Sequence, residues 1–261
     1  MANVKDLTAD LRALGVREGD SLLVHSSIKA VGPVENGADT ILDALEAAVG
    51  RRGLLMLPTH SWDYVNANQP HFYLAESPSC VGMLPEVFRH RPDAFRSWHP
   101  THSVAAWGED AWAVLEGHET FDTPAAWDSP YGRLAQRRGY VLILGARLTN
   151  NTFLHGVEEW CRVPGRLTEE MEMLYTHLPD GRCIPVPSHR HIGHVSERYG
   201  KIRQALLDTG IGWQGKVGMA DCWLLRAEPM ARLVTGLLAK DPDLFGHDGP
   251  VDPADYRDFR P

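Results

Sequence analysis

A histidine and a glutamate, His155 and Glu158, lie three residues apart in the second half of the chain. On an α-helix this spacing places both side chains on one face, where they can interact. A histidine oriented by a carboxylate can act as a general base, because its pKa lies near neutral pH. The pair also fits a structural role, in which Glu158 satisfies a partly buried His155. These two residues alone do not decide between the roles.

The elements around this pair predict a ligand site. Residues 140–145 form a short apolar segment closed by glycine, which is typical of a buried strand in a parallel sheet. Asn150, Asn151 and Thr152 are of types that cap helix N-termini, so we expect a helix after them. Ligands of α/β proteins collect at the carboxyl ends of the strands, where this turn and helix follow.

A second polar turn follows the predicted strand 21–25. Ser26, Ser27 and Lys29 stand directly after it, with Gly32 beyond. Hydroxyls, backbone N–H groups and an ammonium at a strand end suit a phosphate group. When these residues are taken alone, an ordinary serine-rich turn is the preferred explanation.

The next predicted strand, 54–58, follows the predicted helix 38–49. A strand, helix, strand order indicates a parallel crossover, so polar residues after the second strand share the edge of Ser26. Loop packing is the alternative role for them. They are Thr59, His60, Trp62, Asp63 and Tyr64.

A further stretch is rich in polar groups. Ahead of a predicted strand 103–107 stand Arg96, Ser97, Thr101 and His102, which could hold an anion or an oxyanion, or form a proline-kinked loop.

Three histidines, His189, His191 and His194, fall within six residues. They raise the alternative of a zinc-dependent hydrolase, although no HExxH motif is present. An exposed, histidine-rich loop beside the cleft is the other explanation of this segment.

The chain as a whole predicts an α/β fold, with a central, mostly parallel sheet flanked by helices. Residues 171–177 and 182–186, across a Pro-Asp-Gly turn, predict an antiparallel hairpin as an extension. We expect further helices at 7–15, 83–89, 195–207 and 229–238, and a long loop at 65–78. Residues 1–240 should form one domain, and 241–261 a loose tail.

Composition narrows the function classes. With 43% hydrophobic and 23% charged residues, the 261-residue chain is ordinary for a globular protein. Its 26 basic against 34 acidic residues disfavour nucleic acid and favour cationic ligands. No apolar run approaches the roughly 18 residues of a membrane helix. The four cysteines lack a CxxC spacing and the N-terminus lacks a signal-peptide core, so we expect reduced thiols in a cytoplasmic protein.

Taken together and in order, these segments resemble the aminoglycoside 3-N-acetyltransferase family, antibiotic acetyltransferases outside the common GNAT fold. The resemblance covers most of residues 5 to 240. It is carried by Val24-His25-Ser26-Ser27 with Gly32, Leu57-Pro58-Thr59, the stretch from His99 to Gly108, Asp128-Ser129-Pro130-Tyr131, Leu144-Gly145 with Asn151 to Glu158, and Gly215 to Ala220.

The resemblance implies acetyl-coenzyme A as donor, an aminoglycoside amine such as the 3-amino group of 2-deoxystreptamine as acceptor, and no metal. His155 would take a proton from the attacking amine, Glu158 would orient it, and Thr101 would polarise the thioester carbonyl. Residues implied on the coenzyme side are His25, Ser26, Ser27, Lys29, Val31, Arg96, Ser97, Thr101, His102 and Ser103. An acetyltransferase for a different amine remains an alternative.

A cationic acceptor would be held by an acidic, aromatic cleft. We assign to it Thr59, Trp62, Asp63, Tyr64, Asp128 and Glu159, with Glu169 and Glu170 as further acidic candidates. Expected partners are therefore coenzyme A and a small cationic substrate, with no nucleic acid and no membrane, and a homodimer as the candidate assembly. Gly156 beside His155 and the segment 189–194 depart from what the resemblance explains.

Overall fold

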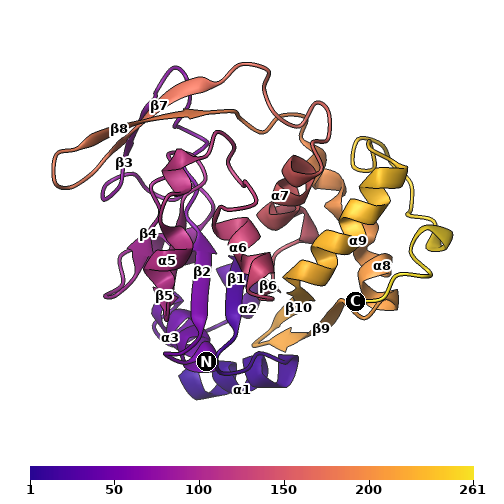
Figure 1. Cartoon of the computed structure of the whole chain (residues 1–261). Helices are drawn as coiled ribbons and strands as arrows, with labels where there is room; N and C mark the ends of the chain where they lie inside the picture. Colours follow the sequence, from indigo (N-terminus) through magenta and orange to yellow (C-terminus); the bar gives the residue numbers. More distant parts are fainter.

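Seven strands form the central sheet, in the order β4-β5-β2-β1-β6-β10-β9, and three more form a small second sheet, β3-β7-β8 (Figure 1). The computed structural model describes residues 1–261. The strands are β1 (Ser21–Ser26), β2 (Leu54–Pro58), β3 (His71–Tyr73), β4 (Phe95–Arg96), β5 (Val104–Gly108), β6 (Tyr140–Leu144), β7 (Glu172–His177), β8 (Cys183–Ser188), β9 (Gly212–Val217) and β10 (Ala220–Arg226).

The three core strands of the large sheet, β2, β1 and β6, run parallel. Their side chains are buried on both faces, which explains why their sequences are continuous apolar runs. The strands on either side, β5 and β4 beyond β2 and β10 and β9 beyond β6, pair antiparallel. The predicted mixed, mostly parallel core is confirmed, and its antiparallel flanks are wider than the sequence indicated.

Helices cover both faces of this sheet. The α-helices are α1 (Val4–Leu14), α2 (Ile28–Val31), α3 (Ala38–Val49), α4 (Met83–Phe88), α5 (Ala111–Leu115), α6 (Pro130–Gln136), α7 (Thr152–Trp160), α8 (Arg203–Asp208) and α9 (Ala227–Lys240). The 3-10 helices are η1 (His118–Thr120), η2 (Leu148–Asn150), η3 (Val195–Ile202) and η4 (Pro253–Asp255).

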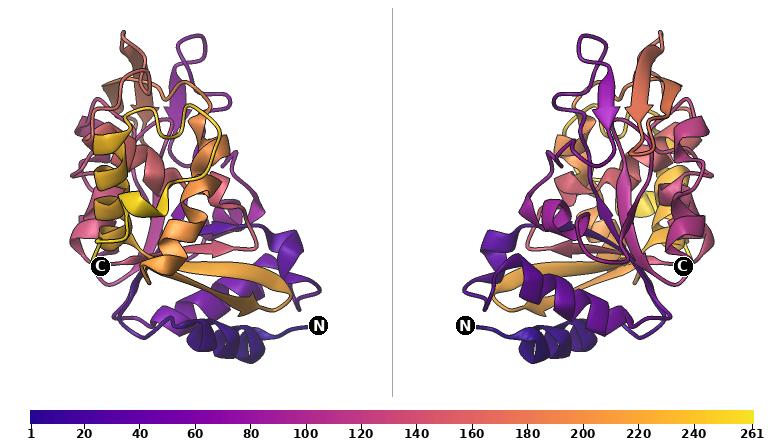
Figure 2. Two further views of the ribbon diagram at one scale, coloured as in Figure 1. Left: turned by 90° about the vertical axis from the view of Figure 1, so that its right-hand side faces the viewer. Right: turned by 90° about the vertical axis from the view of Figure 1, so that its left-hand side faces the viewer.

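The layering follows from the apolar faces of these helices. Leu7, Leu11 and Leu14 of α1 pack with α3 against one face of the sheet, while α6, α7 and α9 pack together on the other. Figure 2 shows α1 and α3 below the sheet and α8 and α9 above it. Each face therefore has its own hydrophobic core, of 25 and 37 buried residues respectively.

The predicted hairpin is β7 and β8, which pair antiparallel from Glu172 with Ser188 to His177 with Cys183. It projects from the domain as part of the small sheet (Figure 1). The third strand, β3, lies inside the segment 65–78 that we expected to be a long loop, and it pairs parallel with β7. Three residues flanked by polar ones give too little periodicity to identify a strand.

Two C-terminal expectations are wrong. The single helix predicted over 195–207 is divided into η3 and α8. The tail is not loose, since Leu244, Phe245 and Tyr256 are buried in the larger core. Two polar contacts also hold it: Lys201 donates to the Leu244 carbonyl, and Arg166 pairs with Asp243. No helix is long and apolar enough to cross a membrane.

Candidate active site

Two adjoining cavities open at the carboxyl ends of the core strands, of about 730 and about 520 Å³. We call them the strand-end cavity and the histidine cavity. Both are bordered by the ends of β1, β2 and β6 or by the segments that follow them, as the parallel core predicts. They share the wall residues His60, Trp62, Val81, Thr149, Asn150 and Thr152.

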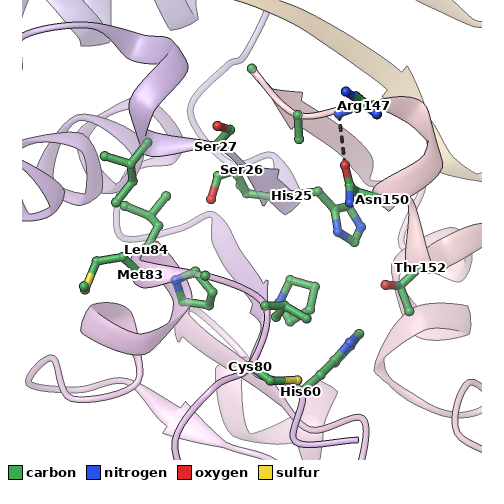
Figure 3. A pocket seen from close by; sticks show the side chains of 18 of the residues that line it. His25, Ser26, Ser27, His60, Cys80, Met83, Leu84, Arg147, Asn150 and Thr152 are labelled. Carbon is green, nitrogen blue, oxygen red and sulfur yellow. Dashed lines mark hydrogen bonds between the residues drawn. The ribbon is translucent and has the colours of Figure 1, made fainter. Parts of the chain in front are cut away.

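The strand-end cavity is lined by the turn after β1 and by the start of α4 (Figure 3). His25, Ser26, Ser27 and Lys29 all reach it, as expected from their order in the sequence. His25 is buried, and its Nε2 atom has no hydrogen-bond partner within the protein. Hydroxyls, backbone and an ammonium along one wall suit a phosphate-bearing ligand.

Gly145 allows the wall of this cavity to close. Its φ of +65° lies in the left-handed region, and a Cβ there would stand 2.5 Å from the Cβ of Ala30. After this turn, the backbone N–H of Arg147 donates to the side chain of Asn150 (3.1 Å, Figure 3). The lining of the cavity therefore includes two cationic residues, Lys29 and Arg147.

The histidine cavity is lined by five imidazoles, of His60, His102, His155, His191 and His194. Burial lowers the pKa of His60, His102 and His155 well below the usual value, and neighbouring histidines lower each further. These three are therefore neutral at pH 7 and can accept protons or hydrogen bonds.

No carboxylate lines the histidine cavity, so the acidic cleft expected for the acceptor is not formed there. Asp63 and Asp128 are exposed and border neither cavity. Glu159 is buried behind the wall, where it accepts from the Ala125 N–H (3.0 Å) and pairs with His191 Nε2 (2.5 Å). Of the residues assigned to the acceptor, only Trp62 lines this cavity.

His155 and Glu158 lie on one face of α7, as predicted, but they do not contact each other directly. The distance from His155 Nδ1 to Glu158 Oε2 is 3.8 Å. The hydroxyl of Tyr199, from η3, stands between them, 2.8 Å from Nδ1 and 2.5 Å from Oε2. The expected direct orientation of His155 by Glu158 is therefore corrected to an indirect one.

The far side of Glu158 is held by Arg166. Its Nε donates to Glu158 Oε1 (2.7 Å) and its Nη2 to Asp243 (3.1 Å). Burial raises the pKa of the Glu158 carboxyl, while Tyr199 and Arg166 oppose that change. The imidazole of His155 also stacks on that of His191, with centroids 4.5 Å apart and planes at 19°.

Gly156 is a poor helix former inside α7, and close packing explains why glycine is present there. A Cβ there would lie 3.0 Å from the Trp160 ring and 3.1 Å from the Ala125 carbonyl oxygen. The glycine lets α7 approach the segment before α6, and thereby sets the position of His155 one residue earlier.

Several residues implied on the coenzyme side instead form an internal polar network. Arg96 donates to the carbonyl oxygens of Leu74, Ser77 and Thr59, and Ser103 bonds Thr59 as well. Burial lowers the pKa of Arg96 to about 9. This network fixes the loops behind the cavities, and neither Arg96 nor Ser103 lines one.

The remaining assignments are also resolved by position. Thr101 is buried and its hydroxyl lies 3.0 Å from His102 Nδ1, so it orients that imidazole rather than facing a cavity. Ser97 pairs with His118 (2.9 Å), Val31 is buried in the core, and Tyr64 donates to the Pro78 carbonyl. None of these four reaches either cavity wall.

The histidines of segment 189–194 do not converge on one point. His189 contacts the Thr168 carbonyl oxygen (2.7 Å), His191 is engaged by Glu159, and His194 adopts a left-handed backbone with φ +49°. No group of three or more His, Cys, Asp or Glu side chains is arranged to hold a metal ion. The zinc site proposed for this segment is therefore not built.

Three contributors to the site were missed in the sequence. Tyr199 carries no local signal, because it lies 44 positions from His155. His191 was considered as a metal ligand or as part of a loop beside the cleft, with no role next to His155, and Thr152 only as a helix start, although Thr152 lines both cavities. A neutral base in one cavity, beside a second cavity suited to an anion, fits a group-transfer site for two substrates.

Comparison with known proteins gives the particular family. The family model described as aminoglycoside 3-N-acetyltransferase matches residues 23–239, so the chain belongs to this family. Aminoglycoside N(3)-acetyltransferase VIII of Streptomyces fradiae is 34% identical over 254 residues, covering 87% of this chain and 88% of that protein. Aminoglycoside N(3)-acetyltransferase III of Serratia marcescens is 40% identical over 201 residues, covering 70% and 73%.

Solved structures agree. AAC-IIIb in a binary complex with CoASH superposes with a TM-score of 0.82 at 28% identity, covering 95% of this chain and 99% of that one. A histidine-to-alanine mutant of AAC(3)-IVa in complex with a gentamicin gives a TM-score of 0.82 at 30% identity, covering 94% and 92%.

Proposed function

We propose that the protein transfers the acetyl group of acetyl-coenzyme A to a primary amine of an aminoglycoside, as its family membership implies. One observation carries the mechanism: His155 lines the histidine cavity, and Thr152, one turn earlier on the same helix, lines both cavities. A thioester in the strand-end cavity and an amine in the histidine cavity would meet beside the start of α7.

The donor would occupy the strand-end cavity. Ser26, Ser27 and Lys29 would hold the pantetheine and pyrophosphate, and Arg147, which lines the same cavity, would contribute a second cation. A solved relative bound to CoASH supports this choice of donor. His25, which lines the same cavity, would lie beside the donor.

The reaction needs one proton acceptor. As the amine nitrogen attacks the thioester carbon, its N–H becomes acidic, and the neutral imidazole of His155 takes that proton. The thioester oxygen gains negative charge at the same time. The first N–H groups of α7, which have no partner within the helix, and the Thr152 hydroxyl would stabilise that charge.

The acceptor would be held by imidazoles and by Trp62, although Arg190 adds a positive charge to the lining of this cavity. Imidazole nitrogens accept hydrogen bonds from ammonium groups, and the half-exposed Trp62 offers an aromatic face to a cation. Relatives crystallised with gentamicin and apramycin support an aminoglycoside acceptor. The absence of carboxylates from the lining predicts weaker binding of highly charged acceptors than an acidic cleft would give.

The test is release of thiol from acetyl-coenzyme A, measured against a panel of 2-deoxystreptamine aminoglycosides with and without a chelator. We expect release that depends on the acceptor and resists the chelator. Saturable coenzyme binding without release for any aminoglycoside would overturn the acceptor. Chelator-sensitive release would favour a metal-dependent mechanism.

Two finer points belong to the same proposal. All four cysteines are free, which suits the cytoplasm expected from the sequence. The homodimer stays a prediction, which light scattering of the purified protein would test.

A further inference from the structure

The hydroxyl of Tyr199 separates the base from its carboxylate. It lies 2.8 Å from His155 Nδ1 and 2.5 Å from Glu158 Oε2, whereas the His155–Glu158 distance is 3.8 Å. Both contacts are within hydrogen-bond range, and the third distance is not. The hydrogen-bonded connection between Glu158 and His155 therefore passes through this hydroxyl, while the carboxylate charge also acts on the imidazole through space at 3.8 Å.

The position of each proton in the hydrogen bonds from Arg166 through Glu158 and Tyr199 to His155 can be assigned, because Arg166 can only donate. Arg166 Nε is always a donor, and it bonds Glu158 Oε1 at 2.7 Å. The other oxygen, Oε2, accepts from Tyr199, whose single proton is thereby used. The Tyr199 oxygen can then only accept from His155, so Nδ1 must carry the imidazole proton.

We propose that Tyr199 is a positioning residue that holds His155 in the tautomer protonated at Nδ1, with the Nε2 lone pair free for the acceptor amine. The inference rests on the proposed function, in which His155 is the base. In this arrangement the neutral Tyr199 hydroxyl, rather than a direct ion pair with Glu158, leaves His155 able to accept a proton at Nε2.

Packing holds the relay rigid. Tyr199 is fully buried, and its ring packs edge-on against Phe245 (4.8 Å) and against His155 (5.2 Å). One face of the His155 ring stacks on His191. The stacking on one face and the hydrogen bond at Nδ1 together restrict rotation of the imidazole, which lines the histidine cavity.

During transfer the relay moves no net proton. The amine nitrogen bonds to the acyl carbon, and the amine proton passes to His155 Nε2. The C–S bond then breaks with its electron pair on sulfur, and that thiolate receives the proton from Nε2. Throughout, the Nδ1–H bond to Tyr199 persists and shortens while His155 is positive, because the buried Glu158 charge polarises the hydroxyl.

Charged and titratable groups face the relay from several elements. Glu158, with Arg166 and then Asp243 behind it, faces Tyr199 from one side. His191, paired with Glu159, stacks on His155, and, besides burial, His60 and His25 also lower the pKa of His155. A change at the Tyr199 oxygen should therefore appear in the pH dependence of turnover and not in coenzyme binding.

The experiment compares Tyr199→Phe with Tyr256→Phe in the full chain. Tyr256 is a matched control, because it is also buried and also donates to a carboxylate, that of Asp208 (2.9 Å), away from both cavities. We expect Tyr199→Phe to lower kcat about 100-fold with the KM for acetyl-coenzyme A unchanged. The deficit should shrink as the pH rises, because hydroxide can then take the amine proton that a wrongly oriented imidazole does not accept. Tyr256→Phe should keep wild-type kcat.

A kcat for Tyr199→Phe within about threefold of wild type, or a deficit that is constant with pH, would overturn the proposal. Nitrogen-15 NMR of the histidine side chains in the wild-type protein gives a second readout, with His155 assigned by comparison with His155→Gln. A neutral His155 protonated at Nε2 would also overturn it, whether or not Tyr199→Phe folds. Lack of any acceptor-dependent turnover by the wild type would count against the proposed function alone.

Discussion

Replacing Glu158 by glutamine should block the base while preserving the fold. Arg166 Nε can only donate, so the new amide oxygen must face it, as Oε1 does now at 2.7 Å. The amide NH₂ then faces Tyr199. Its hydroxyl must accept that bond and turn its own proton toward His155 Nδ1. His155 is thereby forced into the tautomer protonated at Nε2, which has no lone pair for the amine.

The substitution should lower kcat strongly and the free energy of unfolding only moderately. A wrongly protonated imidazole cannot accept the amine proton, and loss of correct tautomer in a comparable base costs up to about 10⁴-fold, so we expect a kcat lower by about 10³-fold. Two charge-assisted hydrogen bonds become neutral ones, and each change costs about 1 kcal/mol, for a total of about 2 kcal/mol. Arg166 keeps its partner Asp243 (3.1 Å), which limits the loss.

Thiol release at saturating acetyl-coenzyme A measures kcat, and urea unfolding measures the stability. Glu46→Gln serves as a control, because Glu46 also pairs with a partly buried arginine, Arg91 at 2.9 Å, on the opposite face of the sheet. It should lose stability without losing turnover. A Glu158→Gln protein with kcat within tenfold of wild type would refute the tautomer argument, and so would equal losses of kcat in both variants.

Other expected outcomes follow from the same site. His155→Ala should abolish acceptor-dependent thiol release while calorimetry finds coenzyme binding largely unchanged; near-normal turnover would remove His155 from the base role. The exposed Ile192 lines the histidine cavity, and Ile192→Glu should lower the KM of multiply charged aminoglycosides about fivefold, about 1 kcal/mol of attraction, whereas neutral Ile192→Gln should not. Burial lowers the pKa of His25 to about 3 and of His118 to about 4, below the ordinary value of 6.5. Below pH 6.5 the unfolded chain therefore binds more protons than the folded one, and stability should fall by about 1 kcal/mol per histidine between pH 7 and 5.5. Urea unfolding at the two pH values checks this, and equal stabilities would contradict it.

Local sequence signals predicted much of the frame of the site. The apolar runs 21–25, 54–58 and 140–145 are strands whose side chains are buried on both faces, so their pattern is complete without knowledge of the partner strand. The helix that carries His155 and Glu158 follows from its cap residues and its spacing. Polar residues directly after those strands, such as Ser26 and Ser27, therefore reached the cavity as expected.

Polar residues farther from a strand end were not predictable in this way. Arg96 has the chemistry of an anion ligand, yet its guanidinium is consumed by the carbonyl oxygens of Leu74, Ser77 and Thr59. Glu159 has the charge expected of an acceptor ligand, yet it points to the Ala125 N–H. A side chain's type states what it can bind, and only the fold states which partners have already bound it.

The sequence by itself thus determined the α/β core, the edge where ligands bind, the family and the helical pairing of His155 with Glu158. Tertiary structure alone decided that Tyr199 stands between those two residues, that His191 stacks on the base, and that the tail is packed. Periodicity and capping act over a few residues along the chain. The contact between Tyr199 and His155 joins residues 44 positions apart in the chain. It depends on how η3 packs against α7, and no local sequence pattern predicts it.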